Sequence, residues 1–352
     1  MAKSSKISRG KRIAIAFGIV ILFSLLAIGY SFYTKVFFPN VALKESPDKY
    51  IYIPTGATFN DVLHLLNSDN LLKNQASFEW VAEQMKYKNR IKAGRYLIKK
   101  NMSNRELVAL LRSGKQTPIK VVFNNVRTKE QLASVVGSQL EADSSAITGL
   151  LGNAQQLQKF GFTPENCMAM FIPNTYEFYW NTSAKKFLER MASEYKIFWN
   201  SSRKAKAANM NLTQSQVSVL ASIVEQETRK NDEKPVIAGV YYNRLTKGWK
   251  LEADPTLVYA LGDFTIQRVL NIHKEIDSPY NTYLNSGLPP GPICIPSIAS
   301  IDAVLNYSKH EYLFFCAKDD FSGYHSFAKT YSQHLLNAKR FQNELNRRKI
   351  RS

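Results

Sequence analysis

The longest apolar segment of the chain lies near its N-terminus. Residues 13–32 read IAIAFGIVILFSLLAIGYSF, and no residue between Arg12 and Lys35 carries a charge. A helix of this length spans roughly 30 Å, which is the thickness of the hydrocarbon core of a bilayer. The pattern therefore predicts a single transmembrane helix over residues 13–34.

The residues on either side of this segment predict its orientation. Lys and Arg but no acidic residue come before it, so the positive-inside rule places residues 1–12 in the cytoplasm and the chain after the segment outside it. A cleaved signal peptide ends in small residues, whereas this segment ends in Tyr30, Phe32 and Tyr33. We therefore expect a permanent anchor rather than a cleaved leader.

A small α/β module is predicted directly after the anchor. Residues 35–48 are charged and lack periodicity, which predicts a linker. Over residues 49–124 we expect three strands and three helices, in the order strand 50–53, helix 59–66, helix 78–85, strand 94–98, helix 103–111 and strand 119–123. The strand–helix–helix–strand order resembles a LysM-like domain, a module that docks on polymers of N-acetylglucosamine. Glycan binding and a role as a spacer both stay open.

After the module the pattern is mostly helical, with short strands between the helices. A polar helical segment over 128–151 precedes an aromatic stretch, FIPNTYEFYW at 171–180, and a short strand is expected at 312–317. We therefore expect a larger α+β domain over residues 125–346 and a basic, solvated tail at 347–352. The fold class of the whole chain is accordingly predicted to be α+β.

Composition narrows the range of partners once the anchor is placed. The formal net charge of +19 favours polyanions, but a position outside the cytoplasm disfavours nucleic acid. The charge is then expected to face wall polymers rich in carboxylates, or the membrane surface. The three cysteines are widely spaced and the five histidines form no metal-binding motif. We therefore expect no disulfide framework, no metal and no cofactor.

The clearest candidate for chemistry is a helix predicted over residues 213–229, TQSQVSVLASIVEQETR, which begins with a capping box. Glu225 and Glu227 lie on opposite borders of its apolar stripe, roughly 160° apart, so the two carboxylates cannot both reach the same sugar. Glu225 has small neighbours that leave room for a ligand, and partial burial would raise its pKa, as a general acid requires. The alternative is a surface ion pair with Arg229 one turn later.

Polar side chains further along the chain each allow a structural and a functional interpretation. Asn243 lies on the apolar face of a helix, where it needs either a buried polar network or a polar ligand. Asp254 is expected to cap a short helix, and a second role is not required. Asn281 and Tyr283 belong to a proline-rich region whose rigid loops suit sugar recognition or simply connect two elements.

Six ordered motifs closely resemble those of the YceG-like endolytic murein transglycosylases. In chain order they are LASIVEQET (220–228), VYYNRL (240–245), LEADPT (251–256), SPYNTY (278–283), GLPPGPI (287–293) and YHSFAKT (324–330). The resemblance extends over essentially the whole chain, including the anchor and the small module. Glu252 departs from the glutamine expected in many relatives, which bears on the polarity of a subsite rather than on the acid.

The resemblance implies an enzyme that cleaves the β-1,4 bond between N-acetylmuramic acid and N-acetylglucosamine and closes a 1,6-anhydro ring on the muramic acid. It places the catalytic acid/base at Glu225, the first glutamate of its motif. It implies substrate-positioning roles for Asn243, Asp254, Asn281 and Tyr283. It also implies the bacterial inner membrane, a catalytic domain outside the cytoplasm, and work near peptidoglycan synthases that terminates nascent glycan strands.

Two other functions stay open at the level of the sequence. A glycosidase that uses water needs two carboxylates at the bond, and Asp254 could serve as the second one in a muramidase-type hydrolase. A lytic transglycosylase needs only one, since an intramolecular hydroxyl supplies the nucleophile at high effective concentration. The hydrolase would leave reducing ends and the transglycosylase anhydro ends. The third candidate is a tethered protein that binds peptidoglycan without cleaving it.

Overall fold

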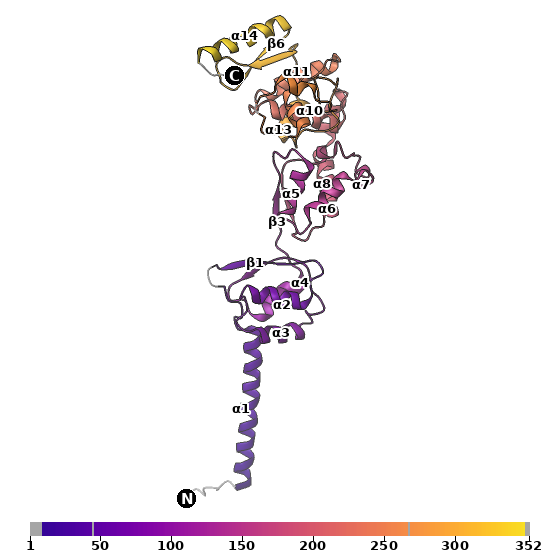
Figure 1. Cartoon of the computed structure of the whole chain (residues 1–352). Coiled ribbons are helices and arrows are strands. Elements are labelled where there is room, and N and C mark those ends of the chain that lie inside the picture. The colour runs from indigo at the N-terminus through magenta and orange to yellow at the C-terminus, as the bar shows by residue number, and fades with distance from the viewer. Residues whose placement is uncertain (1–8, 44–45, 267, 349–352) are drawn as a thin grey trace. The chain divides into compact units, whose positions relative to one another are not determined.

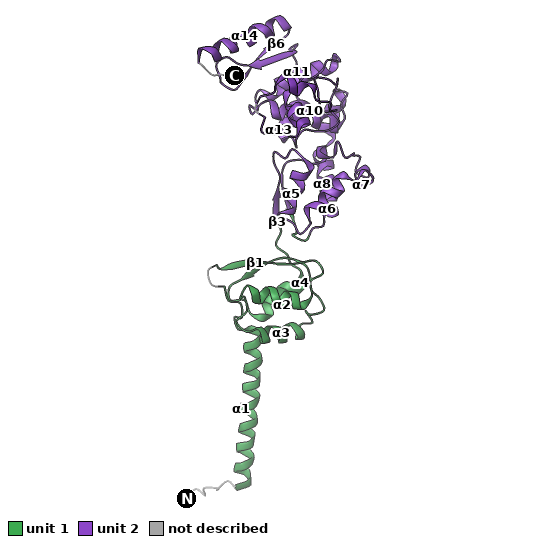
Figure 2. Ribbon diagram, viewed as in Figure 1, with its two compact units in different colours: residues 1–119, 178–181 green, residues 120–177, 182–352 purple. Residues whose placement is uncertain are grey.

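The computed structural model describes residues 9–43, 46–266 and 268–348 (Figure 1). The chain divides into two compact units, which Figure 2 shows in different colours. Unit 1 covers residues 1–119 with 178–181, and unit 2 covers residues 120–177 with 182–352. Helices and strands occur in both, so the predicted mixed fold is confirmed.

The first element of unit 1 is α1 (Arg9–Phe37), which contains the whole of the predicted segment 13–34. It is long and apolar enough to cross a membrane, with a mean hydropathy of 2.6 over its most apolar window. None of its residues is buried against the protein. An exposed helix of this hydropathy has the properties of a membrane span rather than of a core helix.

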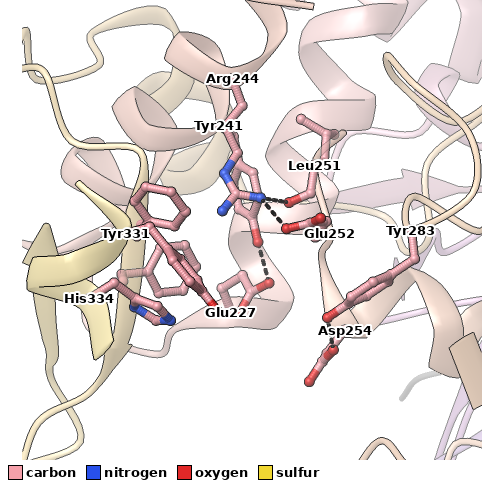
Figure 3. Close-up of a pocket in the computed structure, with 11 residues that line it drawn as sticks. Glu227, Tyr241, Arg244, Leu251, Glu252, Asp254, Tyr283, Tyr331 and His334 are labelled. Carbon is pink, nitrogen blue, oxygen red and sulfur yellow. Dashed lines mark hydrogen bonds and ion pairs between the residues drawn. The ribbon is translucent and has the colours of Figure 1, made fainter. Parts of the chain in front are cut away.

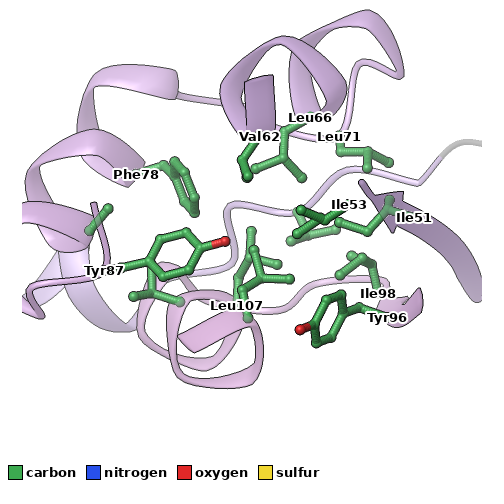
Figure 4. Close-up of a cluster of buried hydrophobic side chains, with 14 of the residues drawn as sticks. Ile51, Ile53, Val62, Leu66, Leu71, Phe78, Tyr87, Tyr96, Ile98 and Leu107 are labelled. Atoms are coloured by element: carbon green, nitrogen blue, oxygen red, sulfur yellow. The ribbon is translucent and has the colours of Figure 1, made fainter. Parts of the chain in front are cut away.

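Three helices and a two-stranded sheet enclose the core of unit 1. β1 (Asp48–Ile53) pairs antiparallel with β2 (Gly94–Lys99). The helices are α2 (Phe59–Ser68), α3 (Gln75–Gln84) and α4 (Asn104–Ser113). Alternate strand residues turn inward and meet one apolar side chain or more from each helix (Figure 4), among them Ile51, Ile53, Tyr96, Ile98, Val62, Leu66, Phe78 and Leu107.

Within the segment 35–48, expected to be a linker, residues 35–43 contribute to the folded part of unit 1, and residues 44 and 45 lie outside the described residues. α1 continues to Phe37, and Val41 then forms a β-bridge with Leu72. Val41 and Leu43 are both buried in the core. The apolar side chains Val41 and Leu43 explain this, because burying them stabilises the unit more than a solvated linker would. The helix therefore leads directly into a packed structure.

The remaining elements form unit 2 and its border with unit 1. In chain order they are β3 (Ile119–Val122), α5 (Lys129–Gly137), α6 (Ser144–Gly152), α7 (Ala154–Gln158), η1 (Cys167–Met170), β4 (Thr175–Phe178), α8 (Ala184–Phe198), α9 (Ser201–Asn209), α10 (Gln214–Glu227), α11 (Lys234–Thr246), α12 (Asp254–Leu261), η2 (Asn271–Glu275), α13 (Ile298–Leu305), β5 (Phe314–Ala317), β6 (His325–Ala328) and α14 (Tyr331–Arg347). β3 pairs with β4, and β5 pairs antiparallel with β6.

The central helix of unit 2 is α10, which contacts α11, α12 and α13. The capping box predicted at its start is present, with Thr213 as the N-cap and Gln216 as its partner. Every residue from 217 to 224 is buried, including two serines. A helix enclosed on all sides needs small residues where its neighbours approach closely. Its first turn and its last turn, residues 225–227, are partly exposed, and both glutamates lie in the last turn.

Candidate active site

A cavity of about 280 Å³ opens in unit 2 beside the end of α10 (Figure 3). Tyr331 and His334 lie on one side of Glu227, and Asp254 and Tyr283 lie on the other. Acidic, basic and aromatic side chains therefore face one space. The lining residues are Glu227, Tyr241, Arg244, Leu251, Glu252, Asp254, Tyr283, Phe314, Phe315, Tyr331 and His334.

Glu227, the last residue of α10, is partly exposed toward this cavity. Its Oε1 accepts a hydrogen bond of 2.5 Å from the hydroxyl of Tyr241. Tyr241 belongs to α11, and its side chain is almost completely buried. Burial, and to a smaller extent the charge of Asp254, raise the pKa of Glu227 to about 7, although the hydrogen bond from Tyr241 lowers it. A carboxyl with a pKa near 7 can both give and take a proton at neutral pH.

Arg244 holds the wall of the cavity together. It lies one turn after Tyr241 on α11 and is buried. Its Nε donates to the carbonyl of Leu313 at 2.7 Å, and its NH1 donates to the carbonyl of Leu251 at 2.9 Å and to Oε2 of Glu252 at 3.1 Å. One guanidinium thus joins α11 to the segment before α12 and to the residue before β5. The fixed fork of donors on arginine allows this.

Asp254 and Tyr283, both predicted to contact substrate, meet at the opposite side of the cavity. The Tyr283 hydroxyl donates to Oδ1 of Asp254 at 2.6 Å. The predicted capping role of Asp254 is wrong: Ala253 is the N-cap of α12, and Asp254 begins the helix with its carboxylate exposed. That carboxylate is therefore available to a ligand in the cavity.

Glu225 lies in a different environment, closed by α11 and α13. Its Oε2 accepts hydrogen bonds from the hydroxyls of Ser297 and Ser300 and pairs with Nζ of Lys234 at 3.2 Å. Burial raises the pKa of Glu225, but these hydroxyls and Lys234 together hold it below its ordinary value. The predicted rise of this pKa is wrong, and the neighbouring cation is Lys234 rather than Arg229. Glu225 does not line the cavity.

Asn243 and Asn281 do not line the cavity either. Asn243 is partly buried, and its amide donates to the carbonyls of His310 and Tyr312 at 2.8 and 3.0 Å, which agrees with a polar network. Asn281 is fully buried, and its amide donates to the carbonyls of Lys274, within η2, and Ile276, just after it. Its Oδ1 accepts the backbone N–H of Tyr283 at 2.9 Å, so it positions that tyrosine.

Sequence reasoning missed most of the cavity. Tyr241 and Arg244 are three residues apart on a helix, which puts them on one face, and both belong to the motif VYYNRL. The sequence pattern favours Glu225 over Glu227. His334 comes from α14, more than a hundred residues further on, and no local pattern could have linked it to α10. In the described part of the chain, no group of three or more His, Cys, Asp or Glu could hold a metal ion.

Comparison with known proteins places the chain in a family. Residues 51–340 match the model of the YceG-like family, and the chain belongs to that family. The resemblance drawn from the six motifs is therefore confirmed.

Individual relatives carry a specific name. The endolytic murein transglycosylase of Bacillus subtilis strain 168 is 29% identical over 328 residues, covering 88% of this chain and 89% of the relative. The protein of the same name from Streptococcus pneumoniae R6 is 29% identical over 346 residues, and this match spans 62% of that longer protein. A crystal structure of a YceG-like protein from Listeria monocytogenes aligns with a TM-score of 0.55 at 26% identity, covering 82% of this chain and 98% of that one.

Proposed function

We propose that this chain is an endolytic peptidoglycan lytic transglycosylase whose reaction takes place in the cavity of unit 2, with Glu227 as the acid/base. The observation that carries the proposal is one partly exposed carboxyl, with a pKa of about 7, inside a cavity walled by tyrosines. The names of the relatives support the substrate class, since they act on murein. Aromatic walls suit the apolar faces of sugar rings.

The reaction follows from one carboxyl that changes its role. Protonated Glu227 gives its proton to the glycosidic oxygen as the bond from that oxygen to C1 of N-acetylmuramic acid breaks. Glu227, now a carboxylate, takes the proton of the C6 hydroxyl of the same sugar as that oxygen attacks C1. A 1,6-anhydro ring forms, no water is consumed, and Glu227 ends protonated as it began.

Glu225, placed at the acid by family resemblance, is the alternative for this role. One of its oxygens, Oε2, already accepts two hydroxyl hydrogen bonds and pairs with Lys234. Each of these contacts favours the carboxylate, whereas a general acid must be protonated. We therefore assign Glu225 to structure and Glu227 to catalysis.

A muramidase-type hydrolase is the second candidate, and one observation favours it. Asp254 and Glu227 line the same cavity, and the charge of Asp254 acts on the Glu227 carboxyl. Two carboxyls at one bond are what a hydrolase needs. The transglycosylase is preferred because the relatives are named endolytic murein transglycosylases.

Unit 1 is proposed to serve as the anchor and as a LysM-like glycan-binding module. Its β1–α2–α3–β2 order and its antiparallel strand pair support the likeness. With α1 across the inner membrane and residues 1–12 in the cytoplasm, unit 2 and the part of unit 1 that follows α1 lie on the outer side, where nascent glycan strands are made. Peptidoglycan synthases are the expected neighbours there.

The test is mass spectrometry of peptidoglycan digested by the full chain in detergent. Wild type is compared with Glu227→Gln, Glu225→Gln and Asp254→Asn. Internal fragments with 1,6-anhydro ends, lost in Glu227→Gln and kept in Glu225→Gln, are the expected result. Loss only in Glu225→Gln would return the acid to Glu225. Reducing ends that disappear in Asp254→Asn would establish the hydrolase instead, and retained binding without any product would indicate a binding protein.

A further inference from the structure

The last turns of α1 are built into unit 1 through a buried polar network. The Asn104 side chain, 1% exposed, donates from Nδ2 to the carbonyl of Lys35 and to Oγ of Ser77, both at 2.9 Å. Its Oδ1 accepts from Nδ2 of Asn40 at 2.6 Å. A buried amide with partners on both sides fixes the groups around it. The direction in which α1 leaves unit 1 is therefore set by α3 and α4.

Aromatic and basic side chains gather where α1 enters unit 1. The ring of Trp80 on α3 lies 5.2 Å from the ring of Phe32, and Nζ of Lys35 lies 5.9 Å from the centre of the Trp80 ring. On α4, the guanidinium of Arg105 lies 5.5 Å from the centre of the Phe37 ring. We call these five residues the collar. Its members come from three helices, so it belongs to the folded unit and not to the anchor alone.

The collar lies at a defined height along α1. The uncharged part of the helix runs from Ile13 to Thr34, which is roughly 33 Å and matches the hydrocarbon core of a bilayer. Phe32 is in the last apolar turn, and Lys35 is the first charge after it. A ring in contact with Phe32 is consequently at the boundary between acyl chains and headgroups. Trp is enriched at that depth, and Lys and Arg reach the headgroups there.

We propose that the collar is a membrane-docking surface through which unit 1 itself sits in the headgroup layer of an anionic phospholipid bilayer. The proposal rests on α1 crossing the membrane. Trp80 supplies the interfacial ring, and Lys35 and Arg105 supply the charges that attract anionic headgroups. Anchor and unit 1 then form one body of fixed tilt and height, rather than a domain tethered by a free linker.

The experiment uses the full chain in nanodiscs that contain phosphatidylglycerol and lipids brominated near the headgroup, which quench nearby tryptophans. The chain has four tryptophans, so the contribution of one tryptophan to the quenched fluorescence is measured by replacing that tryptophan alone. Trp80→Phe is compared with Trp249→Phe, since Trp249 belongs to unit 2 and is 44% exposed. Trp80→Tyr keeps an interfacial ring at the site and serves as a second variant should the phenylalanine disturb folding.

The expected result is that bromine quenches wild type and Trp249→Phe equally, whereas both Trp80 variants lose most of the quenchable emission. Equal quenching of all four proteins, or quenching in none, would overturn the proposal. If the chain does not insert into nanodiscs, the premise that α1 crosses the membrane fails, and the proposal fails with it. Cleavage of peptidoglycan in detergent does not depend on the collar, so a failure of this proposal and a failure of the proposed function give different results.

Discussion

The two sides of the last turn of α10 give two glutamates opposite properties. On one side Glu225 meets two serine hydroxyls and Lys234, and its pKa is lowered. On the other side Glu227 meets one tyrosine hydroxyl and an open cavity, and its pKa is raised to about 7. Burial acts on both carboxyls. The number of donors around each differs, and this difference supports the proposal that Glu225 is a structural anion and Glu227 the acid.

The largest effect is expected from Glu227→Gln. Glutamine keeps the size of the side chain but can neither donate a proton to the glycosidic oxygen nor accept one. Anhydro-ended product should fall roughly 10³-fold, the usual contribution of a general acid/base, with little change in thermal stability. Product quantified by mass spectrometry, beside a melting curve, gives both readings. An active Glu227→Gln protein would contradict the proposal that Glu227, rather than Glu225, is the acid.

Glu225→Gln is expected to show the reverse pattern, a loss of stability with activity retained by the folded protein. Lys234, whose side chain is 5% exposed, would keep its charge without its partner. Breaking such a buried pair costs about 3 kcal/mol. Asp320→Asn is the control, because its pair with Lys318 is exposed and should matter little. Thermal melting followed by fluorescence compares the two, and equal small shifts would contradict a structural role for Glu225.

The sequence was sufficient for what depends on local pattern. The apolar run of α1, the capping box of α10 and the mixed order of helices and strands are all present as predicted. It was insufficient for choosing between the two glutamates, because the helical periodicity shows only that Glu225 and Glu227 point in different directions. Ser297 and Ser300, which lower one pKa, come from α13, some seventy residues away. Long-range contacts of this kind carry no local signal.

Changes beside Glu227 should move the pH dependence of activity in opposite directions. Glu227 must be protonated for the first step, so activity should fall as pH rises through about 7. Tyr241→Phe removes a hydrogen bond that lowers this pKa, which moves the fall to higher pH. Asp254→Asn removes a charge that raises it, which moves the fall to lower pH. Rates measured across pH check both signs, and shifts in one common direction would refute the assignment of this limb to Glu227.

The smallest effect is expected at His334, the member of the cavity furthest from α10 in sequence. In the described part of the chain its buried Nδ1 has no hydrogen-bond partner, and its ring stacks on Phe314 with centroids 5.5 Å apart. Burial lowers the pKa of His334, so the imidazole is neutral at pH 7 and can hydrogen-bond a sugar hydroxyl or amide. Losing one such bond costs about 1 kcal/mol.

His334→Ala should therefore lower kcat/KM about fivefold, mainly through KM, since the lost bond holds substrate and transition state alike. His334→Asn, which keeps a short polar side chain, should restore part of the loss. Ser332→Ala, on the exposed surface of the same helix, is the matched control. Equal kinetics in His334→Ala and Ser332→Ala would mean that this wall does not touch the glycan. Contact with the glycan would then be expected only at the opposite wall of the cavity, which contains Asp254 and Tyr283.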